Sequence, residues 1–168
     1  AALASPYLLG QDAFLKVSAT VQLYQRVGRR LGLRADLRFD QGLPLGGRAL
    51  LPEVERFFAG GDDTVRGFTR DRLKTEILLT DVAPFDGVTQ LRVLPAGGNL
   101  RGLASGEAQF TLGKHPWLGS VVPATALFVD AGFIENRWGG LTWSDVRPAA
   151  GLALRLDLGV GSLSVEYA

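Results

Sequence analysis

The chain contains no cysteine and no methionine, and His115 is its single histidine. The lack of cysteine excludes disulfides and thiolate metal sites, and one histidine cannot build a histidine-rich metal site. The 18 basic and 17 acidic side chains leave a formal net charge of +1, which provides no basic footprint for nucleic acid. We therefore expect no metal, no cofactor and no nucleic-acid partner.

Long hydrophobic runs are also missing. The longest stretch without a charged residue or histidine is residues 116–129, which is shorter than the roughly 18 residues that a transmembrane helix needs. The total length of 168 residues fits one domain or part of a larger one, and the chain begins with Ala1 rather than methionine. We expect a portion of a longer protein that has no membrane-spanning helix here.

Hydrophobic and polar residues instead alternate at every second position in six stretches. In the first stretch, Leu15, Val17 and Ala19 alternate with Lys16 and Ser18. Successive side chains of a β-strand point to opposite faces, so each stretch predicts a strand with one apolar and one polar face. No stretch predicts an amphipathic helix long enough to cover a sheet, so the expected fold class is all-β and antiparallel. The expected strands are residues 13–26, 31–41, 102–112, 124–134, 147–158 and 161–168.

The connections between these strands alternate in length, apart from a moderate third connection. A short turn near Gly28 joins the first two strands, whereas residues 42–101 separate the second strand from the third. Inside this long connection, Leu73, Ile77 and Leu78 have a spacing that allows one helical turn at most. Short turns at one end and long loops at the other are typical of a membrane β-barrel.

Two architectures fit the alternation. A soluble antiparallel sandwich turns its apolar faces inward, and a transmembrane barrel wall turns them toward lipid. The wall is favoured because the strands reach the 9–11 residues or so that a tilted crossing requires, and because a loop of about sixty residues is unusual in a compact soluble domain. The apolar faces also consist mostly of Leu, Val and Ala. Alternation alone does not reject the sandwich.

The stretch RFFAGGDDTVRGF, residues 56–68, is too glycine-rich for a helix and too irregularly charged for an ordinary strand. Together with its lead-in from residue 51, with ALFVDAG at residues 126–132 and with residues 147–168, it resembles the outer-membrane assembly-factor superfamily. That group includes BamA- and TamA-like insertase barrels and the transporters of two-partner secretion. The resemblance leaves out residues 70–96, approximately. It implies a C-terminal part of a barrel, here a partial wall of about six strands.

The same resemblance implies that residues 42–101 fold back into the barrel lumen and carry a VRGF tip at residues 65–68. An arginine inside a barrel needs carboxylate partners, because an unpaired buried cation is costly. Alternation places Glu107 and Asp130 on the polar faces of neighbouring strands, and the family implies the same pairing with Arg66. We expect these three residues to lock the loop, either as pure architecture or as part of a moving step. The other motif residues are expected to turn and pack the loop: Phe57, Phe58, Gly60, Gly61, Asp62, Val65, Gly67 and Phe68.

The function that the resemblance implies is non-enzymatic: a bacterial outer-membrane protein that inserts or assembles β-barrel proteins. No catalytic residue is expected. The implied partners are outer-membrane lipids, unfolded β-barrel or secreted client proteins, and periplasmic or lipoprotein accessory subunits. Three alternatives stay open at this stage, namely a two-partner-secretion transporter, the barrel anchor of a fused enzyme, and a soluble sandwich.

Overall fold

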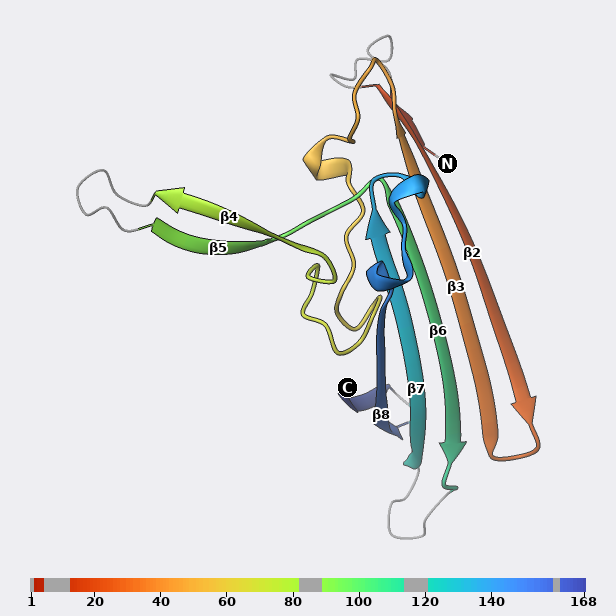
Figure 1. The fold of residues 1–168 in the computed structure, drawn as a ribbon. Helices are drawn as coiled ribbons and strands as arrows, with labels where there is room; N and C mark the ends of the chain where they lie inside the picture. The colour runs from red at the N-terminus through yellow and green to blue at the C-terminus, as the bar shows by residue number, and fades with distance from the viewer. Residues whose placement is uncertain (1, 5–12, 82–88, 114–120, 159–160) are drawn as a thin grey trace.

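The computed structural model of the chain describes residues 2–4, 13–81, 89–113, 121–158 and 161–168. Its main element is one antiparallel sheet in the order β1-β2-β3-β6-β7-β8-β9, in which strands adjacent in the order are also paired (Figure 1). The strands are β1 (Ala2–Ala4), β2 (Phe14–Val27), β3 (Leu31–Pro44), β6 (Leu100–Thr111), β7 (Val122–Glu135), β8 (Arg147–Asp157) and β9 (Ser162–Tyr167). The all-β antiparallel class is therefore confirmed, and the described sheet is open, with β1 and β9 at its edges.

Six of these strands occupy the stretches where alternation predicts them. The expected count of six is nevertheless one short, because β1 pairs with the start of β2 through Ala2, Leu3 and Ala4. A strand of three residues contains too few positions to show a period of two, so the pattern could not reveal it.

The long connection between β3 and β6 also contains two strands that the sequence did not predict. β4 (Thr75–Asp81) and β5 (Thr89–Pro95) form a separate antiparallel hairpin that projects away from the main sheet (Figure 1). The expected helical turn at Leu73, Ile77 and Leu78 is therefore wrong. An isolated helical turn fixes several residues for one hydrogen bond, whereas a hairpin pairs the backbone along its length, and its threonines and branched residues favour strands.

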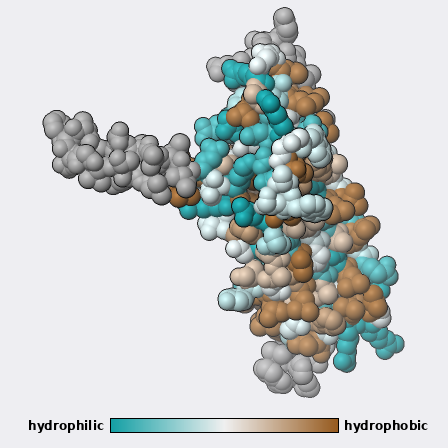
Figure 2. Space-filling model, in the orientation of Figure 1, coloured by the Kyte–Doolittle hydropathy of each residue, from teal (hydrophilic) through white to brown (hydrophobic). Residues whose placement is uncertain are grey.

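The two faces of the main sheet differ in exposure. In β7 the side chains of Ala126, Phe128 and Asp130 are buried, whereas Leu127 and Val129 between them are 52% and 60% exposed. The pairing register places further exposed apolar side chains on that same face, namely Val17, Val21 and Leu23 of β2, Leu33 and Leu37 of β3, Phe110 of β6, Leu152 and Leu154 of β8, and Leu163 and Val165 of β9. Figure 2 shows hydrophobic residues gathered over the strands, and hydrophilic residues over the upper part of the molecule.

The buried contacts lie on the opposite, polar face, where the loop between β3 and β6 folds against the sheet. One cluster joins Ala59, Val65 and Leu73 of the loop to Ile134 of β7. A second cluster consists of Phe14, Leu51 and Phe57. Two short 3₁₀ helices, η4 (Trp138–Gly140) and η5 (Trp143–Asp145), connect β7 to β8, and η2 (Glu53–Glu55) lies at the start of the loop. In the described part of the chain, no helix is long and apolar enough to cross a membrane.

Candidate functional site

The loop between β3 and β6 is fixed first at its base. Phe57 forms an isolated antiparallel bridge with Gly98, with N–H···O distances of 2.9 and 3.0 Å in the two directions. The buried side chain of Asn99 accepts a hydrogen bond from the Leu51 backbone N–H at 2.9 Å and donates to the Ala49 carbonyl at 2.9 Å. Because the two ends of the loop are tied to each other here, its middle can extend as one unit over the polar face.

A tight glycine turn reverses the loop before its tip. Gly60 and Gly61 have φ angles of 114° and 97°, in the region that glycine adopts without a steric penalty. The Thr64 N–H donates to the Gly61 carbonyl at 3.0 Å, which leaves Asp62 and Asp63 exposed at the corner. A Cβ at Gly60 would lie 2.4 Å from the carbonyl oxygen of Thr69, so this position has room only for glycine.

The residues around the tip pack against the polar face of the sheet. Val65 is fully buried, and Gly132 of β7 makes space for it, since a Cβ at Gly132 would lie 2.7 Å from a Val65 methyl. Of the motif phenylalanines, Phe57 is buried and Phe68 packs partly buried against the cluster around Val65. Gly67 has a φ of 87° and is exposed.

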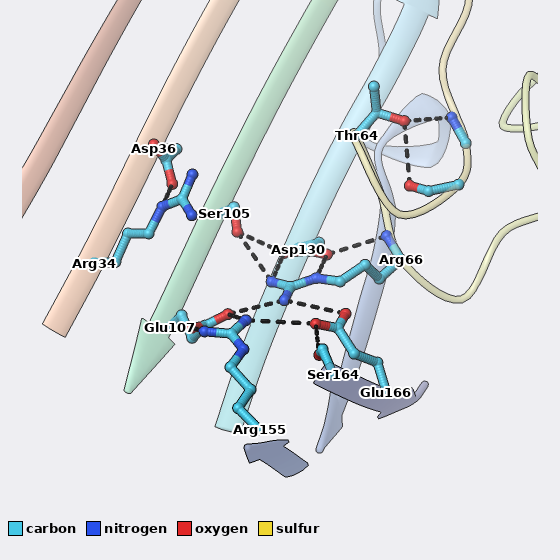
Figure 3. A network of polar contacts seen from close by, with 12 residues as sticks. Arg34, Asp36, Thr64, Arg66, Ser105, Glu107, Asp130, Arg155, Ser164 and Glu166 are labelled. Carbon is cyan, nitrogen blue, oxygen red and sulfur yellow. Dashed lines mark hydrogen bonds and ion pairs between the residues drawn. The ribbon is translucent and has the colours of Figure 1, made fainter. Parts of the chain in front are cut away.

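The Arg66 side chain lies at the tip and points to Asp130 of β7 (Figure 3). Its Nε donates to Asp130 Oδ2 at 2.7 Å and its NH2 donates to Asp130 Oδ1 at 2.9 Å, so the guanidinium grips both carboxylate oxygens. The Arg66 backbone N–H donates to Oδ2 as well, at 3.0 Å. Paired N–H···O bonds of this kind are the strong, geometrically specific form of an arginine–carboxylate contact.

Residues of β6 and β7 complete the surroundings of the guanidinium. Arg66 NH1 donates to Glu107 Oε2 at 2.9 Å, and Ser105 Oγ donates to Asp130 Oδ1 at 2.7 Å. The Cζ of Arg66 lies 3.6 Å from the centre of the Phe128 ring, within the range of a cation–π contact. Pairing register explains this arrangement, because Asp130 lies opposite Ser105, and Phe128 lies opposite Glu107.

The site is largely closed to solvent. Asp130 is 1% exposed, and the Arg66 and Glu107 side chains are also buried. Burial alone would lower the pKa of Arg66, but its hydrogen bonds to Asp130 and Glu107 raise the pKa above its ordinary value. The guanidinium is therefore a permanent cation, and the loop tip is held by charge-assisted hydrogen bonds that withdrawal of Arg66 would break.

Two residues of the last strands extend this network. Arg155 of β8 pairs with Glu107, with NH2 to Oε2 at 2.9 Å, and lies 3.4 Å from Glu166 Oε1 of β9. Glu166 also lies 3.6 Å from Arg66 NH1. Two arginines and three carboxylates therefore form one network, in which β6, β7 and β9 contact the loop tip through charge and β8 joins through Arg155 (Figure 3).

A second anchor holds the loop nearer its base. Arg101 of β6 donates from Nε to Asp40 Oδ2 at 2.9 Å, and its NH1 donates to the Phe58 carbonyl in a short hydrogen bond. Asp40 of β3 is fully buried and also accepts from Arg38 Nε at 3.0 Å. Phe58 thus contributes its backbone carbonyl to the anchor.

Charged and hydroxyl-bearing side chains around the loop tip line a cavity. The cavity has a volume of about 550 Å³ and lies between the loop tip and the polar face, with Arg34, Arg38 and Asp36 of β3 on one side and Asp62 on the other. Among the described residues, no group of His, Cys, Asp and Glu could hold a metal ion. The site can hold the loop tip through ion pairs, and the lining of its cavity is polar and can bind water.

The structure brings together the three residues that the sequence suggested for the lock: Arg66, Glu107 and Asp130. The sequence reasoning missed Arg155 and Glu166, and it also missed the Asp40–Arg101 anchor. The missed residues occupy the polar face of their strands, as Glu107 and Asp130 do, so alternation contained the signal. Alternation does not give the stagger between strands, however, and stagger decides which polar residues meet.

A family model described as the Omp85 superfamily domain matches residues 1–168, the whole chain. No curated protein matches the chain.

Proposed function

Because the chain belongs to the Omp85 superfamily, whose members insert or transport proteins at the bacterial outer membrane, we propose that this sheet is part of the wall of a transmembrane β-barrel insertase. The exposed apolar face of β2 to β9 would contact lipid, and the polar face would line the lumen. The protein would help outer-membrane β-barrel clients to fold into the bilayer.

The observation that carries this proposal is the position of the Arg66 loop relative to the two faces. A soluble sandwich buries its apolar face against a second sheet. Here the described chain folds its own long loop onto the polar face and leaves Leu127, Val129 and their neighbours exposed. An apolar outer face with a polar interior is the pattern of a membrane barrel.

The proposed role of the lock is to hold the loop inside the lumen. Arg66 contacts β7 through Asp130 and β6 through Glu107, and Glu166 of β9 lies nearby. These contacts bridge several adjacent strands, so they would stiffen the wall while other parts of the barrel move to admit a client. Loss of Arg66 would loosen the wall as well as the loop.

A second candidate is a transporter that passes an unfolded polypeptide through the lumen. The cavity of about 550 Å³ beside Arg66 favours it, because its lining alternates Arg34, Asp36 and Arg38 along one strand. Mixed charges and hydroxyl groups keep such a passage hydrated. They also offer little apolar surface to which an extended polypeptide could bind.

Reconstitution of the full-length protein in lipid vesicles tests the proposal and separates the two candidates. We expect the vesicles to speed the folding of an unfolded outer-membrane β-barrel client, measured by its heat-dependent electrophoretic mobility. Arg66→Ala should reduce this acceleration several-fold. Arg70→Ala is the matched control, because Arg70 lies in the same loop but is 88% exposed and pairs only weakly, at 3.9 Å, with Asp71.

Two results would count against insertion. In the first, vesicles with and without the protein fold the client at equal rates. In the second, an unfolded polypeptide added outside reaches a protease trapped inside the vesicles, while no client is inserted. The second result would support the transporter.

A further inference from the structure

Arg155 of β8 lies beside the lock and shares a carboxylate with it. Arg155 NH2 and Arg66 NH1 both donate to Glu107 Oε2, each at 2.9 Å. Arg155 NH1 donates to the other carboxylate oxygen, Oε1. Arg155 therefore donates two hydrogen bonds to Glu107, whereas Arg66 donates one. Figure 3 shows both guanidinium groups close to the Glu107 carboxylate.

The two carboxylates of the lock therefore differ in their dependence on Arg66. Asp130 has Arg66 as its ion-pair partner and receives further hydrogen bonds from Ser105 Oγ and the Arg66 N–H. Glu107 has Arg155 as a second partner that belongs to the wall and not to the loop. If the loop withdrew, Glu107 would stay paired, and Asp130 would lose its cation.

The two arginines also repel each other. Both bind one oxygen atom, so their nitrogen atoms lie within twice the hydrogen-bond length of each other, inside a site that is mostly shielded from water. Like charges at that separation raise each other's free energy appreciably at the effective dielectric of a protein. Arg155 is itself 25% exposed and is held by Gln109 Oε1 at 3.2 Å and by Glu166 as well, so it can remain in place without Arg66.

We propose that Arg155 is a positioning residue that limits how tightly the loop is locked. It keeps Glu107 paired in both the docked and the withdrawn state, and its charge weakens the hold on Arg66. The lock is thereby strong enough to order the loop and weak enough to release it. This inference rests on the proposed function, in which the docked loop belongs to the working cycle of the barrel.

The test measures loop release with a single engineered cysteine, which is practical because the chain contains none of its own. Val65→Cys places a thiol where the docked loop buries it completely, so a maleimide reagent reacts only when the tip leaves the wall. In the full-length protein in lipid vesicles, Arg155→Gln should slow labelling by roughly tenfold, since removing a neighbouring like charge strengthens the pull on Arg66. Arg155→Lys keeps the charge and should label within about twofold of the parent.

The direction of the effect decides the outcome. A merely structural Arg155 would loosen the loop when removed, so faster or unchanged labelling of Arg155→Gln overturns the inference. Slow labelling of Arg155→Lys also overturns it, because charge would then not be the cause. If Arg155→Gln does not fold, Arg155→Met is a second neutral variant with the same expectation.

Arg66→Ala in the same assay separates this inference from the proposed function. Labelling of Arg66→Ala should be faster than that of the parent. If it is unchanged, the lock itself fails. If it is faster while Arg155→Gln is not slower, only the role of Arg155 fails.

Discussion

The Arg66–Asp130 contact should dominate the free energy that docks the loop. Removal of one partner from a buried ion pair costs about 3–5 kcal/mol, because the other charge stays buried without compensation. Asp130 is 1% exposed, and after Arg66→Ala its donors among the described residues would be the Ser105 hydroxyl and the residue 66 N–H. Those two donors and the entry of water place the expected loss at the lower end, about 3 kcal/mol.

Hydrogen exchange of the loop backbone measures this loss. The Leu73 N–H donates to the Ala59 carbonyl at 2.8 Å within the docked loop, so it exchanges when the loop opens. A loss of about 3 kcal/mol corresponds to exchange that is faster by roughly two orders of magnitude. The same peptide in Arg70→Ala should exchange within about twofold of the parent, because the exposed pair of Arg70 contributes little.

A double-mutant cycle then tests whether the two residues act through each other. Asp130→Asn alone should open the loop about as much as Arg66→Ala alone, because each variant breaks the same contact. The double variant should lose much less than the sum of the two, with a coupling of about 2–3 kcal/mol. Additive effects would refute the reasoning, since they would mean that Arg66 and Asp130 stabilise the loop independently.

Three further variants test the other contacts of the loop and the rim of the sheet. Gly60→Ala should weaken loop docking by about 1–3 kcal/mol in the exchange assay, because its φ of 114° is strained for alanine and its Cβ would clash with the Thr69 carbonyl. Gly47→Ala is also strained, at a φ of 81°, but its Cβ meets no neighbour, so it should change exchange of the loop peptide less than Gly60→Ala. Arg101→Gln should raise the rate of hydrogen exchange more at residues 51–58 than at residues 61–68, because the loop base loses the arginine that ties it to Asp40. Equal increases in both peptides would contradict the existence of two separate anchors. Trp138→Ala should lower the stability of the full-length protein by about 0.5–1.5 kcal/mol, because the Trp138 ring stacks on the Phe39 ring with 5.2 Å between ring centres, and an unchanged melting curve would argue against that contact.

The alternation of residues was sufficient to predict most of the sheet. Each long strand has an apolar face and a polar face, as the exposed Leu127 and buried Asp130 of β7 illustrate. The same period placed Glu107 and Asp130 on one face, and the cost of an unpaired buried arginine called for carboxylate partners. The expectation that the Arg66 loop folds back onto that face came from the resemblance to the outer-membrane family, and not from the local pattern.

Contacts that depend on stagger or on short elements were not predictable in this way. Asp40 meets Arg101 only because β3 pairs with β6 in one particular register, and nothing in either strand alone fixes that register. Arg155 reaches Glu107 across the intervening strand β7, a distance in the sheet that alternation does not describe. The hairpin of β4 and β5 was hidden for another reason, because Ile77, Leu78 and Leu79 of β4 are consecutive apolar residues and interrupt the period of two.

The orientation of the sheet is the claim on which the account depends, and one measurement tests it most directly. Single cysteines at each of residues 125–134 of β7, in the full-length protein in lipid vesicles, would be labelled with a nitroxide probe, and its contact with oxygen and with a water-soluble nickel chelate would be compared. The account predicts a period of two, with the odd positions such as Leu127 and Val129 reached by oxygen dissolved in lipid and shielded from nickel. If the nickel chelate reached those odd positions freely, the apolar face would lie in water or against protein, and the barrel-wall account would be wrong.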